Sequence, residues 1–350
     1  MKNILIVLAL VAAVIVGVAI LRQESGDKGE LTPIRIGWSS VWLPEGQLVQ
    51  VMKNTDILKL NGLAGKFDKF TQGGPLSEAA LAGEEDVIFV GSGPAMNLVS
   101  KSDEWRVVSR MEDYRNLIIV PKNSAIKTIN DLKGKVIASP FGSTPYVLSI
   151  IHLQKFGLDP KKDVTMRNVD ILEQSNIVQK GSQESWGEIS AFTSWDPTAA
   201  QFEEQGKARV LVLIPDAGVV VMSKKFYDNN PGAAKNFLKS IIQSYDFYYK
   251  NKNLVNDWYL KDTGANFSYK VMEVAGSLER NNNAKGIGEI SLILGKNDIQ
   301  NMQEEADQAF SLGVLKKQVR VNEFTNQTFI ELAENEIENG DFSQVISVLK

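Results

Sequence analysis

Five turns in this chain share a composition that suits one task, the binding of a small anion. Each follows a strand-like run, contains a proline and precedes a helix-like run; they cover residues 38–44, 72–75, 91–94, 140–145 and 194–197. A chain that turns directly into a helix leaves its first backbone N–H groups unpaired, and the helix dipole adds partial positive charge there. Serine and threonine hydroxyls supply further uncharged donors. We therefore expect these turns to bind one negatively charged ligand.

The turn at residues 140–145 is the fullest example. The apolar run at residues 136–138 has the size of a buried strand, and Gly142 follows its end. Ser143 or Thr144 can cap the next helix, and the proline after them suits its first turn, because proline needs no N–H there. This stretch predicts a strand, an anion-binding turn and a helix in succession.

Single residues in the remaining turns extend the candidate site. Gly73 has no side chain where the backbone would approach a neighbour closely, although a tight turn without a ligand would explain it equally well. The Ser92 hydroxyl is a further donor, and Trp195 could form an apolar wall. Asp196 has two interpretations. It caps the helix that follows, or it faces the cleft, where it would pair with a ligand ammonium.

The first turn and one predicted loop each allow two interpretations. Ser39, Ser40 and Trp42 are expected at the rim of the crevice, while Trp38 and Trp42 could instead cover the edge of the core. The loop predicted after residue 109 contains two arginines at positions 110 and 115. We expect both to be solvated, unless they reach the anion.

Alternating elements must position these turns. Apolar runs predict strands at residues 33–37, 66–71, 87–90, 105–109, 117–120, 136–138, 163–169, 188–193, 208–214 and 216–222. Helices are predicted between them and, beyond residue 222, at residues 231–250, 254–260, 269–282, 298–312 and 324–339. An open α/β sheet aims the ends of its strands at one crevice, where such folds bind ligands. The pattern predicts two hinged α/β lobes that close on a ligand.

Composition limits the possible functions. The chain has 350 residues, a net charge of −4, no cysteine and one histidine. The charge argues against nucleic acid as a partner, and the missing cysteine excludes disulfides, thiolate metal sites and a thiol nucleophile. His152 lies in a predicted helix, and neither a serine–aspartate pair nor other metal-ligating residues lie near it in the sequence. We therefore expect a structural role for it. No cofactor or metal is predicted.

The N-terminus indicates export. A lysine at position 2 precedes 18 uncharged, mostly aliphatic residues at positions 4–21, followed by a polar stretch. This pattern is typical of a secretory signal or an anchor helix. We expect an extracytoplasmic protein with residues 1–30 as signal or anchor plus tether, and an uncleaved membrane anchor is favoured slightly over cleavage.

Several motifs resemble those of one protein family. They include RIGW at residues 35–38, SEAALAGE at 77–84, GSGP at 91–94, INDLKG at 129–134, FGSTP at 141–145, FGLDP at 156–160 and WDPT at 195–198. In this order they resemble the extracytoplasmic solute-binding proteins of ABC importers, in the branch that binds aliphatic sulfonates, taurine and nitrate. The resemblance covers residues 33–214, and beyond residue 250 the chain matches only in being helical.

This resemblance implies a two-lobe type II periplasmic-binding-protein fold. Each lobe would be an open mixed sheet flanked by helices, preceded by the N-terminal hydrophobic helix. Lobe 1 would comprise residues 31–120 and 220–350, and lobe 2 residues 121–219. The resemblance also implies a set of ligand-binding residues, Ser40, Gln72, Gly73, Ser92, Gly93, Gly142, Ser143 and Thr144, to which the turns add Trp42, Trp195 and Asp196.

The function implied is passive binding rather than catalysis. The protein would be a monomer that captures a small organic anion, a sulfonate or taurine, and delivers it to an ABC permease and its ATPase. Nitrate or a pyrimidine or thiamine precursor is the alternative ligand. Enzymes of this fold use cysteine or clustered cysteine and histidine, which this chain lacks. A ligand sensor is the remaining candidate function.

Overall fold

The computed structural model describes residues 30–340 and 345–349. The predicted hydrophobic segment at residues 4–21 lies outside the described residues, and with it the expected signal or anchor. Among the helices that are described, none combines the length and the apolar character needed to cross a membrane.

One mixed sheet runs through the described part of the chain. It has eight strands in the order β2-β1-β3-β8-β4-β7-β5-β6. β1 pairs in parallel with β2 and β3, β5 pairs in parallel with β6 and β7, and the pairs that involve β4 or β8 are antiparallel. The strands are β1 (Thr32–Ser39), β2 (Leu63–Phe70), β3 (Val87–Val90), β4 (Trp105–Pro121), β5 (Val136–Ser139), β6 (Thr165–Asn168), β7 (Ile189–Trp195) and β8 (Ala208–Ser223).

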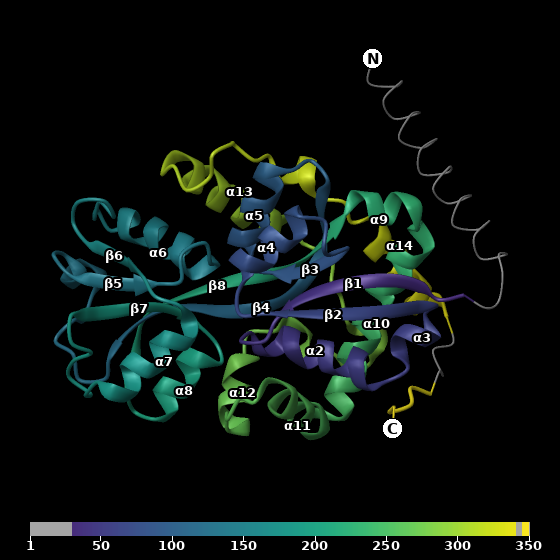
Figure 1. Ribbon diagram of the computed structural model, residues 1–350, viewed down its shortest axis with the longest axis horizontal. Helices are drawn as coiled ribbons and strands as arrows, with labels where there is room; N and C mark the ends of the chain where they lie inside the picture. Colours follow the sequence, from purple (N-terminus) through teal and green to yellow (C-terminus); the bar gives the residue numbers. More distant parts are fainter. Residues whose placement is uncertain (1–29, 341–344, 350) are drawn as a thin grey trace, which may run out of the picture.

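The molecule has two halves joined by β4 and β8, as Figure 1 shows. The first half contains β1, β2 and β3, and the second half contains β5, β6 and β7. The α/β architecture with a mixed sheet flanked by helices is therefore confirmed. The expectation of a separate sheet in each lobe is wrong, because the two long strands pair along their whole length and make the sheet continuous.

Both long strands were predicted as two shorter strands. β4 continues through residues 110–116, where the sequence predicted a loop, and it accommodates this polar stretch with register shifts at Val107/Ser109 and Arg110/Glu112. β8 continues through Pro215, which proline can occupy because β3 pairs with β8 only from Val219 onwards. At Pro215 that side of β8 is an edge, where no ladder hydrogen bond is lost.

Helices cover both faces of the sheet (Figure 1). Helix α10 is central to the largest apolar cluster; its Phe237, Ile241 and Tyr245 are buried, as their spacing predicts. The helices are α2 (Leu43–Asn54), α3 (Ile57–Leu60), α4 (Gly73–Leu81), α5 (Ser92–Lys101), α6 (Thr144–Lys155), α7 (Ile171–Lys180), α8 (Thr198–Glu204), α9 (Lys224–Asn229), α10 (Pro231–Lys250), α11 (Lys252–Thr263), α12 (Tyr269–Ala275), α13 (Lys296–Ser311) and α14 (Thr328–Asn339).

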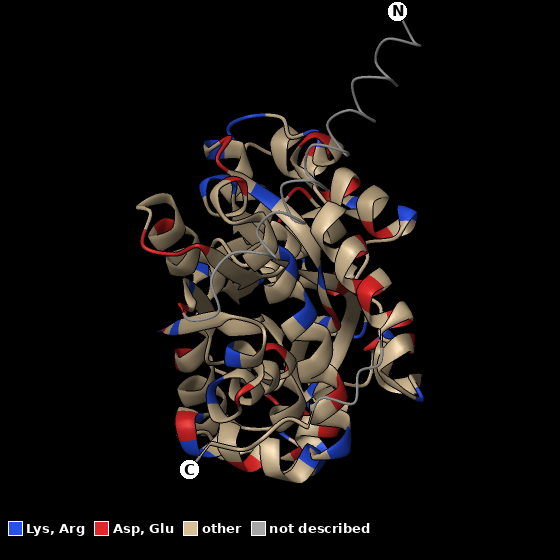
Figure 2. Cartoon of the chain, turned by 90° about the vertical axis from the view of Figure 1, so that its right-hand side faces the viewer, with Lys and Arg blue, Asp and Glu red and all other residues tan. Residues whose placement is uncertain are grey.

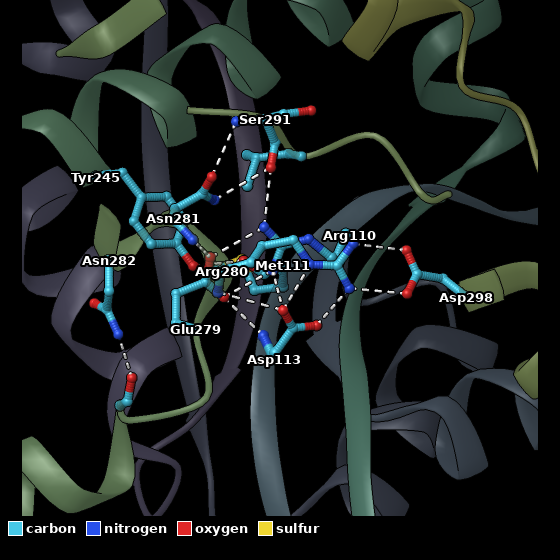
Figure 3. Close-up of polar contacts among 12 residues, drawn as sticks. Arg110, Met111, Asp113, Tyr245, Glu279, Arg280, Asn281, Asn282, Ser291 and Asp298 are labelled. Carbon is cyan, nitrogen blue, oxygen red and sulfur yellow. Dashed lines mark hydrogen bonds and ion pairs between the residues drawn. The ribbon is translucent and has the colours of Figure 1, made fainter. Parts of the chain in front are cut away.

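A charged network fastens the segment before α13 to the middle of β4 (Figure 3). Arg110, which is fully buried, donates to both carboxylate oxygens of Glu279 over 2.7 and 3.0 Å. Arg280 forms a two-pronged pair with Asp113 over 2.6 and 2.7 Å and a second with Asp298 over 3.0 and 2.9 Å. Because Asp298 lies in the first turn of α13, the network fixes where that helix begins.

Two predictions about arginine are corrected by these contacts. Arg110 is not a solvated loop residue but lies in β4, where Glu279 neutralises it. Arg115 is also nearly buried, and it pairs with Asp196 and Glu203. Along the cartoon in Figure 2, the positions of basic and acidic residues are interspersed.

Candidate functional site

All five predicted turns contribute residues to a small cavity between the two halves of the molecule. The turns before α4 and α5 come from the first half, and the turn before α6 comes from the second. The cavity has a volume of about 40 Å³ and is lined by Ser39, Trp42, Gln72, Gly73, Phe89, Val90, Gly91, Pro94, Tyr114, Ser143, Thr144, Pro145 and Trp195. The N-termini of helices from both halves of the molecule therefore lie at the same cavity.

Close packing explains why these turns need glycine. A Cβ atom on Gly73 would lie 2.6 Å from Pro94 Cγ, and one on Gly91 would collide with the hydroxyls of Thr144 and Tyr114. Gly142 has a φ of +82°, which side chains rarely tolerate. The glycines let three turns approach within contact distance, and at Gly73 the close neighbour is Pro94.

Aromatic side chains form one wall of the cavity. The rings of Trp42 and Tyr114 lie 4.8 Å apart between centroids, and Trp195 belongs to the same buried cluster. Trp195 donates its indole N–H to the carbonyl of Val41 over 3.1 Å, a contact from the second half to the first. The two tryptophans that the sequence left ambiguous have different places, because Trp38 lies in the core whereas Trp42 lines the cavity.

One donor in the cavity wall has no partner. Trp42 is 5% exposed, and its Nε1–H has no hydrogen-bond partner among the described residues. The side-chain oxygen of Gln72, at the start of α4, is also buried and unpartnered. Burying a polar group without a partner costs free energy, so an unpartnered donor that lines a cavity indicates a missing acceptor.

The starts of α5 and α6 touch directly. The Gly93 N–H donates to Thr144 Oγ1 over 3.1 Å, and Thr144 is buried. Ser143 is the N-cap residue of α6, and its hydroxyl accepts from the Tyr146 N–H over 3.4 Å. Of the two capping candidates, Ser143 is therefore the cap, and Thr144 is left to bridge the two halves.

Two carboxyl groups lie beside this bridge. Asp216 Oδ2, on β8, accepts from the Ser92 hydroxyl over 2.6 Å and from the Tyr114 hydroxyl over 3.4 Å. Glu305, on α13, is 5% exposed, and its Oε1 lies 3.4 Å from where a Cβ of Gly93 would be. Burial raises the pKa of Asp216 to about 6 despite the bond from Ser92. Burial and the nearby Asp216 charge raise the pKa of Glu305 well above its usual range.

Asp196 is committed to contacts within the protein. Its Oδ1 accepts from the Ala200 N–H in the first turn of α8 over 3.0 Å, so it performs the capping role. Its Oδ2 lies 2.9 Å from Arg115 Nε. Burial raises the pKa of Asp196 to about 7, although the Arg115 charge opposes the shift.

The predicted residues fall into three groups. Trp42, Gln72, Gly73, Ser143, Thr144 and Trp195 line the small cavity. Gly93 and Gly142 line a larger one of about 600 Å³ between α5, α6 and α13. The remaining three line neither cavity: the Ser40 hydroxyl donates to the Phe70 carbonyl, Ser92 holds Asp216, and Asp196 is engaged as described.

Some residues of the site escaped sequence reasoning. Tyr114 fell within a predicted loop, and Asp216 and Glu305 come from segments with no turn motif. No signal in the sequence joins these last two positions. His152, by contrast, is half-buried on α6, with its Nδ1 3.2 Å from the Leu148 carbonyl. No group of three potential metal ligands occurs within the part of the chain that the structure describes.

Comparison with known proteins connects this arrangement to a family. Residues 74–181 match the model described as an ABC transporter, phosphonate, periplasmic substrate-binding protein. The putative aliphatic sulfonates-binding protein of Bacillus subtilis (strain 168) is 26% identical over 351 residues, covering 97% of this chain and 99% of that protein. The taurine-binding periplasmic protein of Escherichia coli (strain K12) is 25% identical over 209 residues, covering 56% and 61% respectively.

The fold agrees with these matches. The alkanesulfonate-binding protein SsuA from Xanthomonas axonopodis pv. citri, solved bound to MOPS, superposes with a TM-score of 0.67 at 20% identity, covering 85% of this chain and 99% of that one. The protein thus has an α/β periplasmic-binding-protein fold, with the mixed sheet and helices described above. The sequence relatives are named as binding proteins. In sequence and in fold the chain is therefore similar to substrate-binding proteins of ABC transporters, among them proteins named for aliphatic sulfonates and taurine.

Proposed function

We propose that the protein captures a small sulfonate outside the cytoplasm, in the cavity between the starts of α4 and α6, and presents it to an ABC permease and its ATPase. The observation that carries the proposal is the unpartnered Nε1–H of Trp42 beside two helix N-termini. The names of the relatives, which refer to aliphatic sulfonates and taurine, supply the ligand class.

The donor set suits a sulfonate for electrostatic reasons. A sulfonate keeps its negative charge at any physiological pH and offers three equivalent acceptor oxygens. Backbone N–H groups, hydroxyls and an indole N–H can surround such a group without an opposing fixed charge, and the helix dipoles favour it further. Neither Lys nor Arg contributes to the lining of the small cavity. Strong but releasable binding is what a delivery protein needs.

Capture requires movement of the two halves. A cavity of about 40 Å³ holds only a few water molecules, and the Gly93–Thr144 bond closes it from one side. Opening would separate α5 from α6 by bending β4 and β8, the two connections between the halves. The lobe boundaries near residues 120 and 220, the monomeric state and membrane attachment through residues 4–21 form part of this proposal.

The test is a ligand panel measured by calorimetry and thermal unfolding. Ethanesulfonate, taurine, nitrate, sulfate and a pyrimidine precursor of thiamine are compared at equal concentration. At 100 times its Kd, a ligand stabilises the folded state by about 2.7 kcal/mol, which gives a clear rise in Tm. We expect the sulfonates to bind and nitrate and the pyrimidine to fail. Binding of nitrate or the pyrimidine with no response to any sulfonate would contradict the proposal.

A fluorescence measurement then locates the ligand. Trp42 and Trp195 line the small cavity, whereas Trp38 and Trp186 are buried elsewhere in apolar clusters. A sulfonate that enters the cavity should change the intrinsic emission of the wild-type protein. The change should shrink in Trp195→Phe. Full retention of the change in both Trp195→Phe and Trp42→Phe would mean that the ligand binds elsewhere.

A further inference from the structure

Two carboxyl groups meet at the start of α5 without a cation beside them. Asp216 comes from β8 and Glu305 from α13, and the Asp216 charge adds to the burial that raises the pKa of Glu305. Neither carboxyl forms an ion pair with a lysine or an arginine in the part of the chain that the structure describes. Two nearby carboxylates disfavour each other's charge, so the arrangement is costly unless a positive charge joins it.

The two carboxyl groups differ in the hydrogen bonds that they accept. Asp216 accepts from the hydroxyls of Ser92 and Tyr114 and lies at the positive end of α5. Glu305 is only 5% exposed, yet its Oε1 has no hydrogen-bond partner among the described residues. Glu305 also lines the larger cavity of about 600 Å³. An enclosed carboxyl oxygen without a hydrogen-bond partner lacks a donor.

The acidic pair lies a short step from the small cavity. The Tyr114 ring lines that cavity, and its hydroxyl is 3.4 Å from Asp216 Oδ2. Thr144 also lines the cavity, and its Oγ1 lies 3.3 Å from where a Cβ of Gly93 would be, the same point that is 3.4 Å from Glu305 Oε1. A ligand whose sulfonate occupies the small cavity needs only a short chain to reach the acidic pair.

The carboxylate of Asp196, which could also have met a positive ligand group, is already engaged. Arg115 and the Ala200 N–H hold its two oxygens. Lys161, which lines the larger cavity with Glu305, forms no ion pair with Glu305 in the described structure. Asp216 and Glu305 are therefore the carboxyl groups beside the cavities that lack a cationic partner.

We infer that the ligand is an aminoalkanesulfonate and that Asp216 and Glu305 form the subsite for its protonated amine. This inference rests on the proposed function, since it assumes that the sulfonate occupies the small cavity. The amine would donate to the free Oε1 of Glu305 and add the positive charge that the two carboxyls lack. The ligand class narrows from any small sulfonate to a zwitterion with a short chain between its charges.

A matched pair of ligands tests the inference directly. Taurine and ethanesulfonate share the sulfonate and the two-carbon chain and differ in the amine. We expect taurine to bind the full chain roughly 10- to 100-fold more tightly, as suits a hydrogen bond between charged groups. Equal affinity, or a preference for ethanesulfonate, would overturn the inference while leaving the proposed function intact. Failure of both ligands to bind would instead contradict the proposed function.

Variants assign the preference to the two carboxyls. Glu305→Gln should remove most of the preference for taurine and leave ethanesulfonate binding equal or stronger, and Asp216→Asn should act in the same direction. Glu304→Gln is the control, because Glu304 is exposed on the same helix and accepts from Gln300. Thermal unfolding without ligand checks that each variant folds. A taurine preference that survives in both folded variants would overturn the inference.

Discussion

The N–H of Gly93 and the hydroxyl oxygen of Thr144 lie 3.1 Å apart and join the starts of two helices from opposite halves of the molecule. The residues are 51 positions apart in sequence, and each follows a strand of its own half. The bond stabilises the closed arrangement around the small cavity, so it should influence the affinity for the ligand.

Replacing Thr144 should therefore weaken ligand binding through closure. Thr144→Val removes the acceptor of the Gly93 N–H, at a cost of about 1 kcal/mol to the closed form, or roughly fivefold in Kd. Calorimetry gives the affinity, and small-angle scattering gives the dimensions of the ligand-free protein, which should increase. Thr144→Ser keeps the hydroxyl and is the control. Equal losses in the two variants would argue against the bond as a closure contact.

The indole N–H of Trp42 should matter more for binding than for folding. Trp42→Phe keeps an aromatic ring beside Tyr114 but removes the unpartnered donor. We expect sulfonate affinity to fall by about 2 kcal/mol, while the Tm of the ligand-free protein stays the same or rises. Trp38→Phe is the matched comparison, because its indole N–H is also buried without a partner among the described residues, but its ring lies in the core. It should leave affinity unchanged; a loss of affinity equal to that of Trp42→Phe would contradict this assignment.

Substitutions in the charged network at β4 should lower the free energy of unfolding by unequal amounts. Glu279→Gln leaves the buried guanidinium of Arg110 without its carboxylate, and we expect a loss of about 3 kcal/mol in unfolding free energy. Arg280→Gln breaks pairs at a side chain that is 45% exposed, so about 1 kcal/mol is expected. Urea unfolding measures both values. A larger loss in Arg280→Gln would mean that exposure does not govern this network.

Glu112 should make stability depend on pH. It is fully buried on β4, both its carboxylate oxygens lack partners among the described residues, and burial followed by repulsion from Glu45 raises its pKa well above the usual range. A raised pKa means that the folded state holds the proton more tightly, so the stabilisation present in acid is lost as pH rises through that pKa.

The Glu112→Gln variant tests this dependence. It should raise the Tm by at least about 2 °C at pH 8, where the wild-type carboxyl costs most, and change it little at pH 5. Glu104→Gln provides a comparison at an exposed position and should have no effect at either pH. A uniform shift of the Glu112→Gln Tm at both pH values would show that packing rather than charge is responsible.

Local patterns predicted the helices and turns well. The bounds of α10 match the predicted residues 231–250, because prolines and amphipathic spacing are local signals. The small cavity was also foreseeable in part, since turns that follow neighbouring strands converge at one edge of a sheet. Six of the eleven predicted site residues line it.

Long-range pairing explains what the sequence could not predict. β4 remains a strand through Arg110 because Glu279 neutralises that arginine from 169 positions away. The acidic pair likewise joins Asp216 to Glu305 across a stretch of helices, and only the folded chain brings them to the start of α5. The expected role of residues 4–21 in export and anchoring stays a prediction, as do the lobe boundaries.

The ladder between β4 and β8 has a mechanical consequence. Its register runs from the pair Trp105 and Ser223 at one end to the pair Pro121 and Ala208 at the other, so both connections between the halves lie within one two-stranded ribbon. Such a two-stranded ribbon bends easily perpendicular to its plane and resists bending within its plane. Any opening should then follow a single preferred arc, with little freedom for sideways sliding.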